Sequence, residues 1–194
     1  KALCTFMFVL AAFSLLLTPL CLAQSGTRTI ASELDAGLSY AESEQVAAAE
    51  TMPDGKYSFA PSGGEFKDVR SFADQLKHIA AYNKMLCSAI EGKTPPSDTA
   101  GGNGPANLKS KGEVLQYLKD AFSYCHQAFK VINEKNAAEE IKPEFRGATS
   151  RLYLAHAASA HSFDHYGQVV VYLRMNGLVP AATVRRQQQQ PSAR

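Results

Sequence analysis

Three of the five histidines in the sequence have a spacing that could hold a metal ion. His161 and His165 lie four residues apart in HSFDHYGQ. On a helix this spacing places two side chains on one face, about 6 Å apart along the axis. His78 lies in a different segment, beside a stripe of apolar residues, and burying it without a partner would cost on the order of 1–3 kcal/mol. Three neutral imidazoles with one open position are the ligand pattern of a catalytic zinc site.

Other interpretations of these histidines stay open at this point. His161 and His165 are also compatible with an ordinary core or surface pair, and His78 could bond a backbone carbonyl or an acidic side chain. Imidazole suits several divalent metals, so zinc or nickel is expected first and iron second. His156 is rotated by about 140° from His161 on a helix. We expect His156 and His126 to be hydrogen bonders in the core or at the surface.

Polar residues next to the three histidines could line such a site, namely Tyr82, Asn83, Asp164 and Gln168. Asp164 points about 100° away from His165 on a helix, so we expect a solvated carboxylate or one that bonds a ligand side chain. The aromatic and the two amides are equally compatible with core packing and interhelical hydrogen bonds. No catalytic residue is assigned, because the stretch between the paired histidines lacks the glutamate that acts as general base in H-E-x-x-H metalloproteases.

Helical segments with apolar residues at steps of three and four must position these side chains. They are expected at about 30–52, 71–90, 110–132 and 148–176. Ser71 and Ser110 are expected N-caps, and Glu113 completes a capping box with Ser110. Gly177 is expected to end the last helix, and no strand run is evident. Helices of this kind bury their apolar faces against one another, so the sequence predicts an all-α four-helix bundle.

The connection between the second and third helices, residues 92–109, is unusually long for a compact domain. It predicts a long crossover loop rather than a tight hairpin between these helices. Cys87 and Cys125 lie on the apolar faces of the two flanking helices. They could form a disulfide in an oxidising compartment, or remain two free thiols in the core.

The first residues of the sequence predict a signal peptide. A basic residue and a long apolar stretch precede small residues before Gln24, so cleavage is expected after Ala23. A retained membrane anchor is the alternative, because the apolar stretch is close to the minimum length of a span. The chain is thus expected to comprise a signal peptide at 1–23, a helical domain at 24–183 and a disordered polar tail at 184–194. The protein is then expected in the periplasm or outside the cell, without a stable membrane span after cleavage.

The composition is that of an ordinary packed domain and excludes some partners. Hydrophobic residues make up 45% and charged residues 20% of the sequence. The net charge is +2 and no long basic run occurs, so nucleic-acid binding is not expected. The expected partner is a small-molecule substrate or ligand, and the sequence also allows a homodimer.

Several motifs together resemble the DinB-like family of small metalloenzymes. The matching pieces are MPDGKYSFAPSGGEF at 52–66, RSFADQLKHIAAYN at 70–83, HSFDHYGQ at 161–168 and VVVYLRMNGLVPAAT at 169–183. The resemblance implies a four-helix bundle with a crossover and a metal bound by His78, His161 and His165. Some members are S-transferases that use low-molecular-weight thiols, and others are proposed hydrolases or isomerases. The chain departs from the family in Tyr166, where many members carry arginine, and in its signal peptide, because such thiols are mainly cytoplasmic.

The residues and the resemblance lead to three functional hypotheses. The first is a metal-dependent transferase or hydrolase, in which the metal lowers the pKa of a bound water or substrate thiol. The alternative is a non-catalytic exported protein that binds a metal or a small ligand, with a closed site or no cavity. In the third, the histidines are structural and the protein is an interaction module whose stability does not depend on metal.

Overall fold

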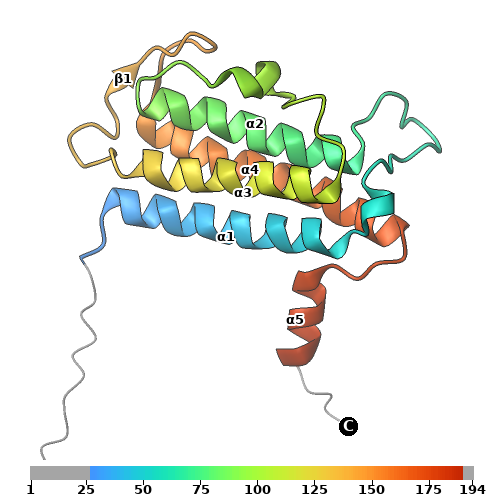
Figure 1. Cartoon of the computed structure of the whole chain (residues 1–194). Helices are drawn as coiled ribbons and strands as arrows, with labels where there is room; N and C mark the ends of the chain where they lie inside the picture. Colours follow the sequence, from blue (N-terminus) through green and yellow to red (C-terminus); the bar gives the residue numbers. More distant parts are fainter. Residues whose placement is uncertain (1–26, 190–194) are drawn as a thin grey trace, which may run out of the picture.

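Four long helices pack side by side in the computed structural model, which describes residues 27–189 (Figure 1). The helices are α1 (Ile30–Thr51), α2 (Phe72–Ile90), α3 (Lys111–Phe129), α4 (Arg151–Met175) and the short α5 (Ala181–Gln189). The predicted all-α bundle is therefore confirmed. The predicted signal peptide at 1–23 lies outside the described residues. Among the helices that are described, none is long and apolar enough to cross a bilayer.

Side-chain caps explain where the long helices begin. Ser71 accepts a hydrogen bond from the backbone amide of Asp74 at the start of α2. The predicted capping box of Ser110 and Glu113 is present at the start of α3. Helix α4 begins three residues later than predicted, because Ser150 caps it and accepts from the amide of Tyr153. Each cap satisfies a backbone amide that a helix leaves without a partner in its first turn.

Helices α2 and α3 run in the same direction, as the predicted crossover requires (Figure 1). The connection between them returns along the bundle and contains the 3-10 helix η2 (Ser97–Gly102). Lys84 on α2 pairs with Asp98 of this crossover at 2.5 Å, and the hydroxyl of Tyr117 on α3 donates to the Asp98 carbonyl at 3.0 Å. Gly104 has a φ of +70° and a Cβ there would lie 3.0 Å from the Lys77 carbonyl oxygen, so the crossover runs tightly against α2.

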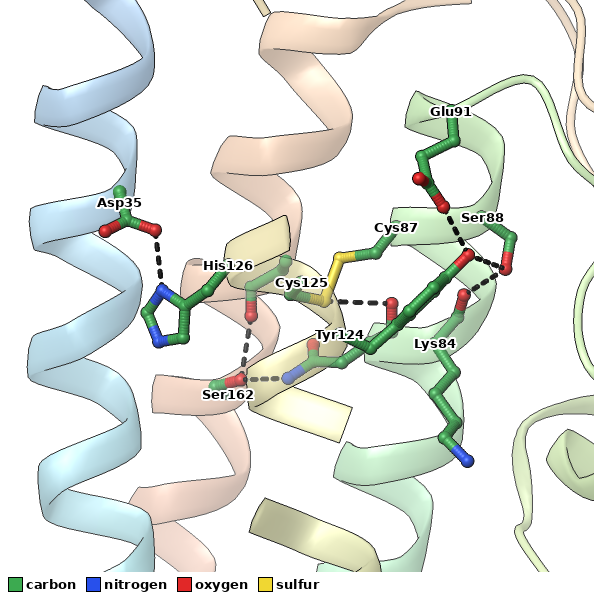
Figure 2. Close-up of a disulfide and its surroundings, with 11 residues drawn as sticks. Asp35, Lys84, Cys87, Ser88, Glu91, Tyr124, Cys125, His126 and Ser162 are labelled. Atoms are coloured by element: carbon green, nitrogen blue, oxygen red, sulfur yellow. Dashed lines mark hydrogen bonds and ion pairs between the residues drawn. A yellow bond between two sulfur atoms is a disulfide. The ribbon is translucent and has the colours of Figure 1, made fainter. Parts of the chain in front are cut away.

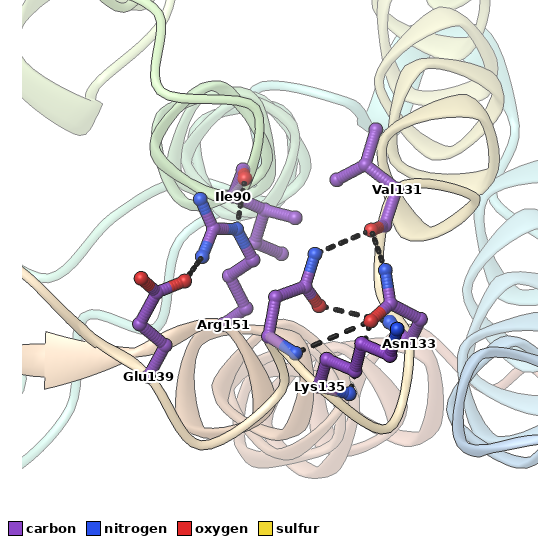
Figure 3. Close-up of polar contacts among 7 residues, drawn as sticks. Ile90, Val131, Asn133, Lys135, Glu139 and Arg151 are labelled. Carbon is purple, nitrogen blue, oxygen red and sulfur yellow. Dashed lines mark hydrogen bonds and ion pairs between the residues drawn. The ribbon is translucent and has the colours of Figure 1, made fainter.

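Two short strands, which the sequence did not predict, precede α4. They are β1 (Glu140–Ile141) and β2 (Thr149–Ser150), paired antiparallel. Strands of two residues are too short to show an alternating apolar pattern, so the sequence does not predict them. Arg151 follows β2 and donates from Nε to the Ile90 carbonyl at 3.1 Å, while its guanidinium lies 3.3 Å from Glu139 (Figure 3). The strand pair and this arginine close one end of the bundle. A further 3-10 helix, η1 (Asp54–Lys56), follows α1.

A disulfide between Cys87 and Cys125 joins α2 to α3 in the interior (Figure 2). Both cysteines are fully buried, and their Cα atoms lie 5.2 Å apart. Of the two alternatives left open by the sequence, the structure therefore contains the disulfide. Nearby, the hydroxyl of Tyr124 on α3 donates to Glu91 at the end of α2 at 2.6 Å. The α2–α3 interface is thus fixed by a covalent and a polar link.

The prediction of a disordered tail at 184–194 is wrong for residues 184–189, which belong to α5. Helix α5 is short and polar, and none of its residues is buried, so burial of an apolar face does not explain its position. It is held instead by an ion pair between Arg185 and Glu44 of α1. Glu44 is only 4% exposed and also accepts from the hydroxyl of Tyr166 at 2.7 Å. A buried carboxylate needs such partners, and this requirement anchors α5 to the bundle.

The free energy of unfolding is expected to decrease as the pH rises through the raised pKa of His126, because the ring then loses its proton. Its ring lies between two carboxylates of α1. Nδ1 lies 2.6 Å from Asp35 (Figure 2), and Nε2 lies 3.0 Å from Glu42. Partial burial lowers the pKa of His126, but the hydrogen bonds to Asp35 and Glu42 outweigh it and raise the pKa above its usual value. A raised folded-state pKa stabilises the protein fully below the unfolded value of about 6.5, and this stabilisation disappears as the pH rises through the folded-state pKa.

Denaturant unfolding of the native protein and His126→Gln measures this effect. The difference in unfolding free energy between the two proteins should be larger at about pH 6 than at about pH 9. A difference of the same size at both pH values would show that the charge of His126 does not link α3 to α1.

Candidate metal centre

His78, His161 and His165 meet between α2 and α4. One potential ligand atom from each histidine lies within 4.8 Å of the others. The Nε2 atoms of His78 and His161 are 3.2 Å apart. The ring centroid of His165 lies 4.7 Å from that of His78 and 4.5 Å from that of His161. The structure thus brings together the histidine of the second helix and the pair of the fourth helix.

Hydrogen bonds fix the tautomers of two of these imidazoles. Nδ1 of His78 lies 2.5 Å from the carbonyl oxygen of Gly102, in the crossover. Nδ1 of His165 lies 2.6 Å from Oε1 of Gln75, one turn before His78 on α2. A carbonyl oxygen can only accept, so each Nδ1 carries the proton and donates it. The Nε2 atoms of both histidines therefore keep their lone pairs, as metal ligands must.

His161 is positioned by stacking rather than by a hydrogen bond at Nδ1. Its ring is stacked on the ring of Tyr82, with centroids 4.2 Å apart and planes inclined by 29°. Its Nδ1 atom is buried and has no hydrogen-bond partner among residues 27–189. Tyr82 therefore covers one face of the His161 ring and restricts the orientation of the third imidazole.

All three histidines are held in the neutral form. Burial is the largest cause, and it lowers the pKa of His161 to about 3 and that of His165 to about 4, with neighbouring imidazoles adding to the effect. Burial also lowers the pKa of His78. The positive charge of Arg70 acts in the same direction on each of the three. Neutral imidazoles are therefore present throughout the physiological pH range, with lone pairs available for a cation.

The donor set fits a divalent metal. Two nitrogens bound to tetrahedral zinc at about 2.0–2.1 Å lie about 3.3 Å apart, and the Nε2 atoms of His78 and His161 are separated by 3.2 Å. Two lone pairs at this distance repel each other unless a proton or a cation lies between them. Within the described chain, no fourth histidine, cysteine or carboxylate joins the group. Three protein ligands leave a coordination position for water or a substrate.

The four polar residues that were predicted to line the site have different environments in the structure. Tyr82 stacks on His161, as described above. Asn83 is fully buried and donates from Nδ2 to the hydroxyl of Ser162 at 3.2 Å, so it joins α2 to α4. Asp164 is exposed. Gln168 accepts from Nε2 of Gln75 at 2.9 Å and thereby belongs to the hydrogen-bond chain that orients His165.

Sequence reasoning missed Gln75 and Gly102, the two acceptors that orient the histidines. Gln75 precedes His78 by three residues, and this spacing on one helix face could have revealed it. Gly102 contributes a backbone carbonyl from the crossover, for which the sequence carries no signal. Tyr166 directs its hydroxyl to Glu44 of α1, so the polar end of this side chain is already engaged.

Replacing Gln75 by leucine is expected to weaken metal binding about 10-fold to 100-fold, the usual effect of losing a partner of a metal-binding histidine. Leucine cannot accept the proton of His165 Nδ1, so the ring is free to rotate and to change tautomer. Competition with a chromophoric chelator measures the affinity. Gln75→Glu keeps an acceptor at this position and serves as the control, because it should retain native affinity or exceed it. Equal affinities of the leucine variant and the native protein would exclude this role.

Comparisons with known proteins agree with this architecture. A family model described as the DinB superfamily matches residues 38–169. The chain is also similar to the crystal structure of a conserved protein from Enterococcus faecalis, with a TM-score of 0.60 and 15% sequence identity. That match covers 76% of this chain and 96% of the other. At this identity the similarity concerns the fold alone. No curated protein matches the chain.

Proposed function

The chain belongs to the DinB superfamily, and from this premise we propose that it is a metal-dependent enzyme, a transferase or hydrolase acting on a small molecule. His78, His161 and His165 would hold a divalent metal, with zinc or nickel expected before iron. The observation that carries the proposal is the convergence of three neutral imidazoles without a fourth protein ligand among the described residues. A site used only for stability would be expected to close its coordination shell with protein groups.

A divalent cation held here would supply Lewis acidity and would lower the pKa of a water molecule or a substrate thiol. The contribution of the chain is orientation. Gly102 and Gln75 accept the Nδ1 protons of two histidines and keep their Nε2 lone pairs directed at one point. Tyr82 stacks on the ring of His161 and restricts its orientation. Preorganised ligands of this kind need no rearrangement when a cation or substrate arrives.

The alternative function is a non-catalytic exported protein that binds a metal or a small ligand. The observation in its favour is that the group of three histidines contains no carboxylate that could act as general base. The carboxylate nearest in sequence, Asp164, is exposed.

Export is part of the proposal and is supported by the disulfide between Cys87 and Cys125. Structural disulfides persist in oxidising compartments and are rare in the cytosol. A protein in the periplasm or outside the cell would meet few low-molecular-weight thiols, so a substrate other than these would be required there.

Cobalt(II)-loaded protein tests whether the site has an open position. Adding 3-mercaptopropan-1-ol should produce a thiolate-to-cobalt charge-transfer band, because a small thiol can occupy the position that the protein leaves free. The His161→Ala variant, loaded under the same conditions, is the control and should show a weaker band or none. A cobalt spectrum that does not respond to the thiol would indicate a closed site and would favour the non-catalytic alternative.

A further inference from the structure

An arginine without an acidic partner stands beside the histidine cluster. Arg70 directly precedes the N-cap residue of α2 and is exposed. Its guanidinium donates to the side-chain oxygen of Asn103 at 3.2 Å, and within residues 27–189 it takes part in no ion pair.

Arg70 is held by the two elements that also position the histidines. The hydroxyl of Tyr172 on α4 donates to the Arg70 carbonyl at 3.0 Å, and Tyr172 follows His165 by two helical turns. The guanidinium is bound to Asn103, the crossover residue next to Gly102, whose carbonyl orients His78. The arginine head group is therefore placed near the edge of the site by neutral contacts, which leave its charge uncompensated.

The nearby carboxylates are engaged elsewhere or lie outside the cluster. Asp74 on α2 pairs with Lys77 at 2.9 Å, and Asp98 of the crossover pairs with Lys84 at 2.5 Å. Asp164, next to His165, is exposed and does not belong to the group of potential ligands, although its charge offsets part of the positive charge there. A dication bound by three neutral imidazoles keeps its full charge, since no ligand in the group is anionic. The dication and the guanidinium of Arg70 would together favour a ligand with a negative charge.

We propose that the substrate of this site carries an anionic group, a carboxylate or a phosphate, and that Arg70 binds it. A guanidinium is suited to this role because its planar fork of donors matches both groups. The reactive end of the same molecule would lie at the histidines. Arg70 thus selects the substrate and does not itself take part in the chemistry. The inference rests on the proposed function, because it assumes that a small molecule enters the metal site.

Two thiols of similar size separate this inference from the proposed function. 3-Mercaptopropionate carries a carboxylate where 3-mercaptopropan-1-ol carries a hydroxyl, and the charge-transfer band of cobalt(II)-loaded protein reports the dissociation constant of each. We expect the carboxylate thiol to bind about 10-fold to 100-fold more tightly, as for a hydrogen bond to a charged group. Arg70→Gln should abolish this preference, and Arg70→Lys should retain part of it. Arg146→Gln removes an exposed arginine that packs on Tyr153 instead, so it controls for net charge and should keep the preference.

Equal affinities of the native protein for the two thiols would overturn the assignment of Arg70 while leaving the open metal site intact. A preference that persists in Arg70→Gln would also overturn it, because another group would then be the anion contact. If neither thiol changed the cobalt spectrum, the proposed function would fail, and the inference that rests on it would fail too.

Discussion

Removing the imidazoles of His78, His161 and His165 together is expected to reduce the bound divalent metal from about one ion per chain to about zero. The three ligand atoms lie within 4.8 Å of one another, and two of the rings are held in the metal-binding tautomer by Gly102 and Gln75. Preorganisation of this kind lowers the cost of binding, because the ligands are ordered before the cation arrives. Elemental analysis of protein purified without a histidine tag and without added metal measures the content directly.

Thermal unfolding provides an independent measurement of the same site. A ligand that binds only the folded state stabilises it by about 2.7 kcal/mol when present at 100 times its dissociation constant. A chelator should therefore lower the unfolding temperature of the native protein and leave the triple alanine variant unchanged. His156→Ala is the matched control, since His156 is an exposed histidine on the same helix and its loss should affect neither measurement.

If the native protein contained no metal, even after reconstitution with zinc, nickel or iron, the proposed metal centre would be wrong. The three histidines would then be a buried polar cluster, with a proton shared between His78 and His161. That outcome would also remove the basis for the proposed enzyme and leave a helical bundle with an unknown ligand.

The helices and the histidine pair of α4 could be predicted from the sequence because both depend on local spacing. Ser71 and Ser110 mark helix starts through side chains within one turn. The pair of His161 and His165 is a property of one helix. The long connection between the second and third helices predicted the crossover, because a connection of this length can run back along the bundle instead of forming a tight hairpin.

Long-range contacts explain what the sequence did not predict. Helix α5 depends on the ion pair between Arg185 and a buried carboxylate more than a hundred residues away. The orientation of His78 depends on a backbone carbonyl of Gly102 in the crossover. Whether Cys87 can bond Cys125 depends on the relative direction of α2 and α3. The two helices run parallel, and both cysteines therefore lie near the same end of the bundle. None of these contacts has a local sequence pattern.

Replacing Cys87 and Cys125 together by alanine is expected to lower the free energy of unfolding by about 4 kcal/mol. The disulfide closes a loop of 38 residues, and the chain-entropy model gives about 3.9 kcal/mol for a loop of this length. For a domain of this size, such a loss corresponds to a decrease of about 8–16 °C in the unfolding temperature. Both side chains are fully buried, so the small cavities left by alanine add to the effect.

Reductant distinguishes the cross-link from packing. Unfolding of the native protein should shift to lower temperature when the disulfide is reduced, whereas the double variant should give the same curve with and without reductant. A native protein that is insensitive to reductant under denaturing conditions would show that the two thiols are not linked. The disulfide fixes α2 against α3, while the histidines lie between α2 and α4. The double variant should therefore bind metal with an affinity close to that of the native protein as long as it is folded, because the covalent link and the candidate metal centre stabilise different interfaces of the same helix.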